Sequence, residues 1–182
     1  MNDFNLKLIE ERQMTAQTDQ AIRDLLCICF PPDVEIFSKL RPWNNVQPVY
    51  SLIYEKDGRL LGHVGVVYRE VSCNGLPVAV AGIQSMAVHP DLRGTGLGQA
   101  IMKECVAEAS RRGVRFGLLF CNEHLSKSFY NRLGWVRIDE KITMSDENGH
   151  TIALSDKNIA MFLPLAGEPL PSGPIDLQGR EW

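Results

Sequence analysis

The stretch from Met86 to Gln99 constrains the fold of this chain more than any other part of the sequence. An apolar run of β-type residues leads into it, and a Pro-containing turn and Arg93 follow. Glycines then stand at three alternate positions, Gly94, Gly96 and Gly98. Glycines let backbone amides approach an anion without a Cβ in the way, and the free N–H groups of a helix start carry positive partial charge. The stretch is therefore predicted to be a strand, an anion-binding turn and a helix N-terminus.

Two common phosphate-binding motifs do not fit this spacing. A dinucleotide-binding turn needs G-x-G-x-x-G directly after a strand, whereas His89-Pro90-Asp91 separates the strand from these glycines. A P-loop ends in Gly-Lys-Ser/Thr, whereas Gly98 is followed by Gln99. A glycine-rich turn with a purely structural role is the remaining alternative. The joint presence of Arg93, the alternate glycines and the helix start argues against it.

The composition limits the class of protein. The 182 residues are 45% hydrophobic and 23% charged, which is typical of a soluble globular domain. A net charge of −3 argues against a general nucleic-acid binder, which would carry a basic face. No apolar run approaches the ~20 residues that cross a bilayer, and the first residues lack a signal-peptide pattern. The five scattered cysteines match neither a disulfide framework nor a zinc site, so we expect reduced thiols, no metal and a cytoplasmic location.

Hydrophobic periodicity predicts the remaining elements. The predicted strands span residues 6–10, 49–54, 60–71, 78–88, 116–121, 135–139 and 159–163. The predicted helices span residues 18–29, 33–40, 96–112 and 123–133, with Thr18 or Asp19 as the cap of the first. This order predicts an α+β fold with a central, mostly antiparallel mixed sheet flanked by helices. We expect residues 1–182 to form a single domain, with a tail at 164–182 packed on it.

Two segments resemble motifs of the GNAT superfamily of N-acyltransferases. The first, Val88-x-Pro90-x-x-Arg93-Gly94-x-Gly96-Leu97-Gly98, is similar to the superfamily's pyrophosphate loop, Arg/Gln-x-x-Gly-x-Gly/Ala. The second, Ser126-Lys-Ser-Phe-Tyr130-Asn-Arg-Leu-Gly134-Trp135, resembles its small-x-x-Leu-Tyr-x-x-x-Gly-Phe segment. The predicted element order is also the GNAT order, and the resemblance extends from about residue 5 to about residue 165. It implies the GNAT acyltransferase fold and an acyl-CoA donor, most simply acetyl-CoA.

The resemblance also implies roles for individual residues on the donor side. The loop amides would surround the CoA pyrophosphate, and the backbone at the end of the preceding strand would pair with the pantetheine arm. The Met86 N–H would polarise the thioester carbonyl. Asn122 lies one residue from a pantetheine-binding position of the family, and a strand-end cap is the equal alternative. The predicted cofactor-binding residues are Met86, Ala87, Val88, Arg93, Gly94, Thr95, Gly96, Leu97, Gly98, Asn122 and Ser126.

Tyr130 lies at the family position that faces the sulfur atom. A phenol with a pKa near 10 can protonate the departing thiolate there. A core aromatic residue on an amphipathic helix is the structural alternative for Tyr130. With the pyrophosphate loop present, we predict Tyr130 and Met86 as the catalytic residues.

The acceptor side departs from the family pattern, because Gln84 stands where many GNAT enzymes have a proton-accepting Glu. A lysine-like amine with a pKa near 10.4 costs roughly 4 kcal/mol to deprotonate at about pH 7.4, whereas an amine with a pKa near 7.7 costs well under about 1 kcal/mol. The sequence therefore favours a low-pKa acceptor. Six groups remain as substitute bases, and the sequence does not choose among them: His63, His89, His124, Asp33, Glu35 and the terminal carboxylate.

The tail resembles those of two GNAT branches, the nodulation-factor N-acyltransferases and the aminoglycoside 2′-N-acetyltransferases. Trp43, interpreted as a large exposed side chain over the site, resembles the first branch, and Asp33 and the last four residues resemble the second. A tail that only covers a sheet edge is the alternative. The predicted substrate-side residues are Asp33, Trp43, Gln84, Ser85 and Trp182.

These observations predict an N-acyltransferase that moves an acetyl or other acyl group from acyl-CoA to a primary amine. The amine would be a small amino sugar or another low-pKa amine, and it would attack directly in a ternary complex. A protein N-terminal acetyltransferase and a CoA-binding regulatory module without catalysis are the two alternatives. The predicted partner is a small molecule, not a nucleic acid or a membrane, and the sequence allows a homodimer.

Overall fold

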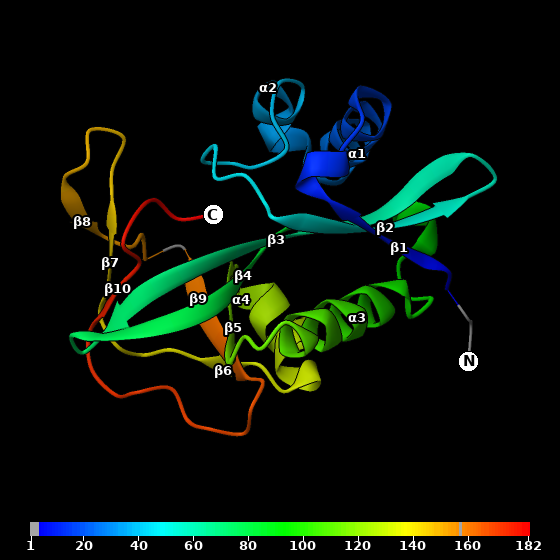
Figure 1. The fold of residues 1–182 in the computed structure, drawn as a ribbon. Coiled ribbons are helices and arrows are strands. Elements are labelled where there is room, and N and C mark those ends of the chain that lie inside the picture. The colour runs from blue at the N-terminus through cyan, green and yellow to red at the C-terminus, as the bar shows by residue number, and fades with distance from the viewer. Residues whose placement is uncertain (1–3, 157) are drawn as a thin grey trace. The chain divides into compact units, whose positions relative to one another are not determined.

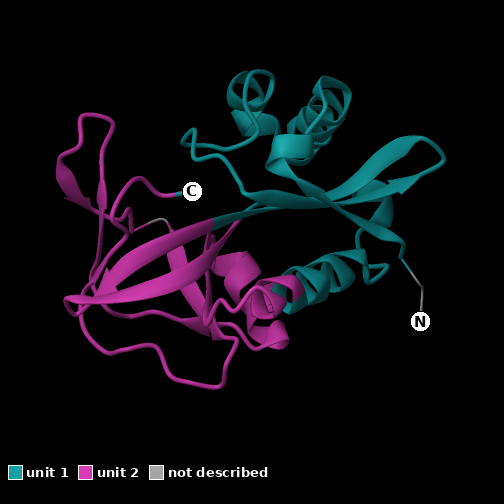
Figure 2. Cartoon of the chain, viewed as in Figure 1, with its two compact units in different colours: residues 1–67, 84–107, 182 teal, residues 68–83, 108–181 magenta. Residues whose placement is uncertain are grey.

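The computed structural model describes residues 4–156 and 158–182. They form two compact units, shown in teal and magenta in Figure 2. The described residues of the first unit are 4–67, 84–107 and 182, and those of the second unit are 68–83, 108–156 and 158–181. The strands β3 (Arg59–Cys73) and β4 (Leu76–Val88) and the helix α3 (Leu97–Arg111) each contribute residues to both units.

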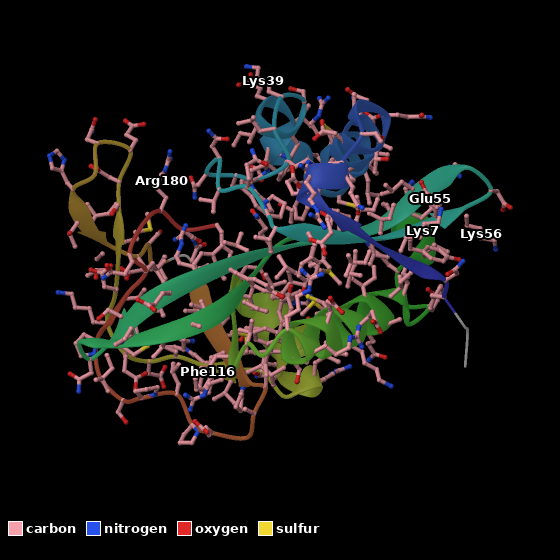
Figure 3. The ribbon with its side chains drawn as sticks, viewed as in Figure 1. Lys7, Lys39, Glu55, Lys56, Phe116 and Arg180 are labelled. Carbon is pink, nitrogen blue, oxygen red and sulfur yellow. The ribbon has the colours of Figure 1, made fainter. Side chains whose placement is uncertain are left out.

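The first unit is built on an antiparallel group of strands. Besides its shares of β3, β4 and α3, it contains β1 (Leu6–Glu10), η1 (Glu11–Gln13), α1 (Ala16–Cys29), η2 (Pro31–Asp33), α2 (Val34–Phe37), β2 (Tyr50–Lys56) and η3 (Pro90–Leu92). β1 pairs antiparallel with β2, and β2 pairs antiparallel with β3. At the β1–β2 edge, Lys7 forms an ion pair with Glu55, and the two side chains lie close together in Figure 3.

Helices lie on both sides of these strands, with α1 and α2 on one side and α3 on the other (Figure 1). The apolar stripe of α1 packs into a buried cluster: Ile22, Leu25, Leu26, Phe37, Ile53 and Ala87. On the opposite side Gly62 lets α3 approach closely, because a Cβ at this position would lie 2.7 Å from Cδ1 of Ile101. The sheet therefore separates two packed layers within this unit.

The second unit contains the remaining shares of β3, β4 and α3 and nine further elements. These are β5 (Phe116–Cys121), α4 (Glu123–Leu125), η4 (Ser126–Tyr130), η5 (Asn131–Leu133), β6 (Val136–Arg137), β7 (Ile142–Ser145), β8 (Thr151–Ala153), β9 (Ile159–Pro164) and β10 (Ile175–Asp176). Its strands follow the order β6-β9-β5-β4-β3-β10-β7-β8. The β4–β5 and β10–β7 pairs are parallel, and the β5–β9 pair is antiparallel, so the sheet is mixed.

In the core of the second unit, the Trp135 ring packs closely against Gly117 of β5. A Cβ on Gly117 would lie 2.7 Å from Cη2 of Trp135, so only glycine leaves room for the indole ring. The tail also belongs to the sheet, because β10 pairs antiparallel with β3 and parallel with β7. Residues Ile175 and Asp176 of the tail thus form an internal strand of the sheet, between β3 and β7.

The α+β fold class with a mostly antiparallel mixed sheet is confirmed, as are the seven predicted strands in outline. Three details differ. α1 begins at Ala16 with Thr15 as its cap, whose side chain accepts a hydrogen bond from the Thr18 N–H. The predicted helix 123–133 is three short turns, and β7, β8 and β10 are additional strands. Among the described helices, none is both long and apolar enough to traverse a membrane.

Candidate active site

The glycine loop has the predicted form. η3 ends at Leu92, and α3 begins at Leu97, five residues later. Gly94 and Gly96 have φ values of +79° and +92°, which L side chains rarely adopt, and an added Cβ at either residue would meet nothing within 4 Å. The loop is therefore an open glycine cradle at the start of a 15-residue helix. The Arg93 and Thr95 N–H groups bond to carbonyls within the loop, so the N–H groups of the helix start are those that can attract an anion.

Side chains anchor this loop to the end of β4. The Val88 carbonyl accepts hydrogen bonds from Sγ of Cys29 and Nε of Arg93, both at 3.4 Å. His89 Nδ1 accepts from the Asp91 N–H at 3.3 Å. Thr95 Oγ1 donates to the Leu92 carbonyl at 2.7 Å. These bonds hold the loop in shape from within, which is the preorganisation that a phosphate site needs.

Gln84 and Ser85, the two residues before Met86 in β4, are buried. The Gln84 Nε2 donates to the Val46 carbonyl at 2.8 Å, while its Oε1 is buried without a hydrogen-bond partner among the described residues. Ser85 Oγ donates to the Arg41 carbonyl at 3.0 Å, and Ser85 has a left-handed φ of 49°. Gln84 cannot accept the proton of an ammonium ion, but its free Oε1 can accept a hydrogen bond from an amine N–H.

His63 supports the same strand from β3. Its ring is fully buried, with Nδ1 2.8 Å from the Ser85 carbonyl oxygen and Nε2 3.2 Å from Ser51 Oγ. Burial lowers the pKa of His63 to about 4, and the nearby Arg41 charge lowers it further against the opposing effect of the Ser85 hydrogen bond. His63 is therefore neutral at physiological pH, and both of its nitrogens are occupied. That arrangement removes it from the substitute bases.

The structure gives the surroundings of three further residues that were predicted on the substrate side. Trp43 is not the exposed side chain expected, because its ring packs edge-on against Phe30 and Phe37 at centroid distances of 5.0 and 4.7 Å. Trp182 is also buried, with 4% of its surface exposed. Asp33 is half-buried at the end of η2. The sequence had no signal for the aromatic cluster, since Phe37 and Trp43 meet through a loop without periodicity.

The second unit holds the other predicted motif. Asn122 Oδ1 accepts from the Leu125 N–H at 2.8 Å, so the cap interpretation of Asn122 is observed. Ser126 and Tyr130 are buried at the two ends of a π-helical turn, η4. The Tyr130 ring lies edge-on to Phe129 and Trp135, at centroid distances of 5.0 and 6.2 Å. Single π turns occur frequently at functional sites, because they redirect a side chain within a helix.

Glu181 is a candidate residue that the sequence did not identify. Its Oε1 accepts a hydrogen bond from Nδ2 of Asn158 at 2.6 Å. Burial raises the pKa of Glu181 from 4.5 to about 7, and the Asn158 hydrogen bond opposes that shift only in part. Asn158 directly precedes Ile159, which pairs with Cys121 at the end of β5. A carboxyl that titrates near neutral pH therefore lies at the Asn122 end of β5.

Relative to the wild type, the Glu181→Gln variant is expected to become more stable as the pH rises. The raised pKa means that the folded protein keeps this proton between pH 4.5 and about 7, while the unfolded chain has lost it. The stability contribution of Glu181 is therefore present below pH 4.5 and lost as the pH rises through about 7. Urea unfolding of variant and wild type near pH 5 and pH 8 measures the change.

Glu123→Gln is the matched control for this prediction. Hydrogen bonding and ion pairing with Lys127 lower the pKa of the exposed Glu123, so its carboxylate is charged at both pH values. We expect the stability difference between Glu123→Gln and wild type to be the same near pH 5 and pH 8. A Glu181→Gln difference that is equally flat would show that Glu181 does not titrate in this range.

Comparisons with known proteins agree with these motifs. Residues 20–135 match the acetyltransferase (GNAT) family model. A GNAT acetyltransferase from Brucella melitensis, solved with acetyl-CoA, is 21% identical with a TM-score of 0.61, and the match covers 95% of this chain and 96% of that one. The Escherichia coli GNAT protein YhbS, solved with CoA, is 16% identical with a TM-score of 0.65, covering 98% and 92%.

A third solved structure also matches over most of the chain. It is an aminoglycoside 6′-N-acetyltransferase complexed with coenzyme A, 14% identical with a TM-score of 0.57, and the match covers 90% of this chain and 99% of that one. Identities this low show a shared fold. The family model spans more than half of the chain, including the glycine loop and Tyr130. The chain therefore belongs to the GNAT family of acetyltransferases.

Proposed function

We propose that this chain transfers an acetyl group from acetyl-CoA to the primary amine of a small amino sugar or another low-pKa amine. The observation that carries the proposal is the open cradle of Gly94 and Gly96 at the start of α3, since an added Cβ at either glycine meets no protein atom. The amides of this loop fit a pyrophosphate group. Bound acetyl-CoA supplies an activated thioester.

The residues of the chain then have separate tasks. The Met86 N–H donates to the thioester carbonyl and stabilises negative charge on its oxygen. The Tyr130 phenol donates its proton to the leaving sulfur as the C–S bond breaks, and the proton that the nitrogen loses when the amide forms passes through solvent water and restores the phenol. Gln84 Oε1, buried and without a partner among the described residues, accepts a hydrogen bond from the substrate amine and orients it. Because an amide cannot take up the ammonium proton, the acceptor must reach its neutral form at little cost.

The cost of deprotonating the amine limits the class of acceptor. An amine with a pKa near 7.7 is about one third neutral at about pH 7.4, whereas a lysine side chain costs roughly 4 kcal/mol to deprotonate. Amino sugars and α-amino groups meet this requirement. The likeness of the tail to the nodulation-factor and aminoglycoside 2′ branches supports an amino sugar over a protein N-terminus.

A thiol-release assay with acetyl-CoA tests the function. The acceptors are glucosamine and an aminoglycoside, a peptide with a free N-terminus, and an Nα-blocked lysine. We expect turnover with the amino sugars and little with the lysine. Turnover with the peptide alone would instead identify a protein N-terminal acetyltransferase. Tight acetyl-CoA binding without release of thiol on any amine would identify a regulatory module.

Gly96→Ala is expected to raise the KM for acetyl-CoA by about 10- to 100-fold, because losing one or two charge-assisted amide contacts costs about 1.5–3 kcal/mol. The added Cβ meets no protein atom, so the loss reflects the φ of +92° and the bound phosphate. Gly58→Ala is the control, since Gly58 has a φ of +73° and equally open surroundings in the β2–β3 turn. Steady-state kinetics should show an unchanged KM for Gly58→Ala, and equal effects in both variants would contradict the cradle.

A further inference from the structure

The peptide that joins Ser85 to Met86 is held in an unusual way. Ser85 has a φ of 49° within β4, a conformation that a non-glycine residue keeps only where its surroundings impose it. Two hydrogen bonds do so within the first unit. Ser85 Oγ donates to the Arg41 carbonyl at 3.0 Å, and the Ser85 carbonyl lies 2.8 Å from Nδ1 of His63.

The partners of His63 define its tautomer. A carbonyl oxygen can only accept, so the proton must be on Nδ1 of His63. The other ring nitrogen, Nε2, is then an acceptor, and Ser51 Oγ at 3.2 Å donates to it. One neutral tautomer satisfies both contacts, and His63 is only 1% exposed.

We propose that His63 is a positioning residue that fixes the Ser85–Met86 peptide plane and thereby aims the Met86 N–H at the thioester carbonyl. The inference rests on the proposed function, in which that N–H stabilises charge on the thioester oxygen. A peptide unit is planar, so the direction of its C=O determines the direction of its N–H. The contact of His63 with one end of this plane therefore controls the other end.

The hydrogen bond from His63 acts in two ways on this peptide. It restrains rotation of the plane, and a misplacement of about 1 Å at a reacting group can cost about 100-fold in rate. It also polarises the amide, because hydrogen bonds in series strengthen one another, by about 10–30% per bond. Both effects act on the charge that develops during reaction more than on the binding of acetyl-CoA. The effect of His63 should therefore appear in kcat and not in KM.

A set of His63 variants separates positioning from simple packing. His63→Leu removes the hydrogen-bond donor to Ser85, and we expect kcat to fall about 10- to 100-fold. This loss is smaller than the loss of about 100- to 1000-fold that follows the removal of an oxyanion donor itself. The KM for acetyl-CoA should stay within about threefold of the wild-type value. His63→Asn places an amide N–H near the former Nδ1 position, and we expect it to recover most of kcat. Ile22→Val, a fully buried change in the core of the same unit, serves as the stability control and should leave kcat unchanged.

A spectroscopic measurement adds a readout that packing alone would not produce. In ¹⁵N-histidine NMR spectra we expect His63 in the Nδ1-protonated neutral form, and we expect the Met86 amide proton to move upfield in His63→Leu but not in Ile22→Val. Thermal unfolding verifies that each variant is folded, and if His63→Leu is not, His63→Gln replaces it as the variant without a donor to Ser85.

Several results would overturn the inference. They are an unchanged kcat in His63→Leu, a His63→Asn variant as impaired as His63→Leu, or a proton found on Nε2. A wild-type protein that turns over no amine would overturn the proposed function itself, and the role of His63 with it. A wild type that is active alongside an equally active His63→Leu would overturn the positioning role alone.

Discussion

Tyr130→Phe is expected to lower kcat by about 10²- to 10⁴-fold, the usual contribution of a general acid, while leaving the KM for acetyl-CoA within a few-fold. The change removes only the hydroxyl group. The ring keeps its edge-on contacts with Phe129 and Trp135, and the side chain is only 6% exposed, so its packing should persist. Activity persisting at the wild-type level would show that Tyr130 is a core aromatic residue and that the thiolate leaves without its proton.

The leaving group provides a second measurement of the same role. If Tyr130 protonates the sulfur, a donor whose thiolate is already stable should depend less on the phenol. We therefore expect the ratio of wild-type to Tyr130→Phe activity to shrink when acetyl-CoA is replaced by an acetylated donor with a more acidic thiol. Phe129→Leu, which alters the neighbouring ring but retains the hydroxyl group, is the matched control, and its activity ratio should not depend on the donor.

The glycine loop was predictable from the sequence because its physics is local. Alternate glycines, an arginine and a helix start lie within six residues, and the positive φ values of Gly94 and Gly96 are what such a pattern requires. Asn122 was ambiguous for the same reason. A residue between a strand and a helix caps the helix whether or not it also binds a ligand, and the structure shows the cap.

The parts that escaped prediction depend on tertiary contacts. β10 is two residues long, too short for any periodicity, and it forms because Ile175 lies between Cys73 and Ile142. Trp43 reads as exposed because its loop is polar, whereas its packing partner Phe37 is buried. The raised pKa of Glu181 arises from burial by segments distant in the sequence. Tertiary context thus decides the surroundings of most of the acceptor-side residues.

Among the ion pairs of the first unit, we expect those made by the buried Arg41 side chain to contribute most to stability. Arg41, which is 5% exposed, donates to Asp19 Oδ1 at 2.7 Å and forms an ion pair with Glu11. Burial raises the pKa of Asp19, but hydrogen bonds from Arg23 and Arg41 outweigh it, and the net pKa lies below its ordinary value. The carboxylate of Asp19 is therefore stabilised chiefly by these two guanidinium groups.

Arg41→Met is expected to lower the free energy of unfolding by about 2–4 kcal/mol. Methionine retains much of the apolar stem but leaves two carboxylates without their shared cation, and the removal of one partner from a buried pair costs about 3–5 kcal/mol. The lower part of the range applies because about a third of the Glu11 and Asp19 side chains is exposed, at 31% and 33%. Urea unfolding near pH 7 measures the loss.

Lys7→Met is the matched control, because Lys7 pairs with Glu55 at the surface, with side chains 54% and 36% exposed. Exposed pairs contribute about 0–1 kcal/mol, so Lys7→Met should be nearly neutral. Adding Glu11→Gln to Arg41→Met removes the carboxylate that has lost its cation, whereas Asp19 still pairs with Arg23, and should restore part of the lost stability. A loss in Arg41→Met no greater than that in Lys7→Met, or a double variant weaker than Arg41→Met, would mean that desolvation of Arg41 cancels the benefit of its two ion pairs.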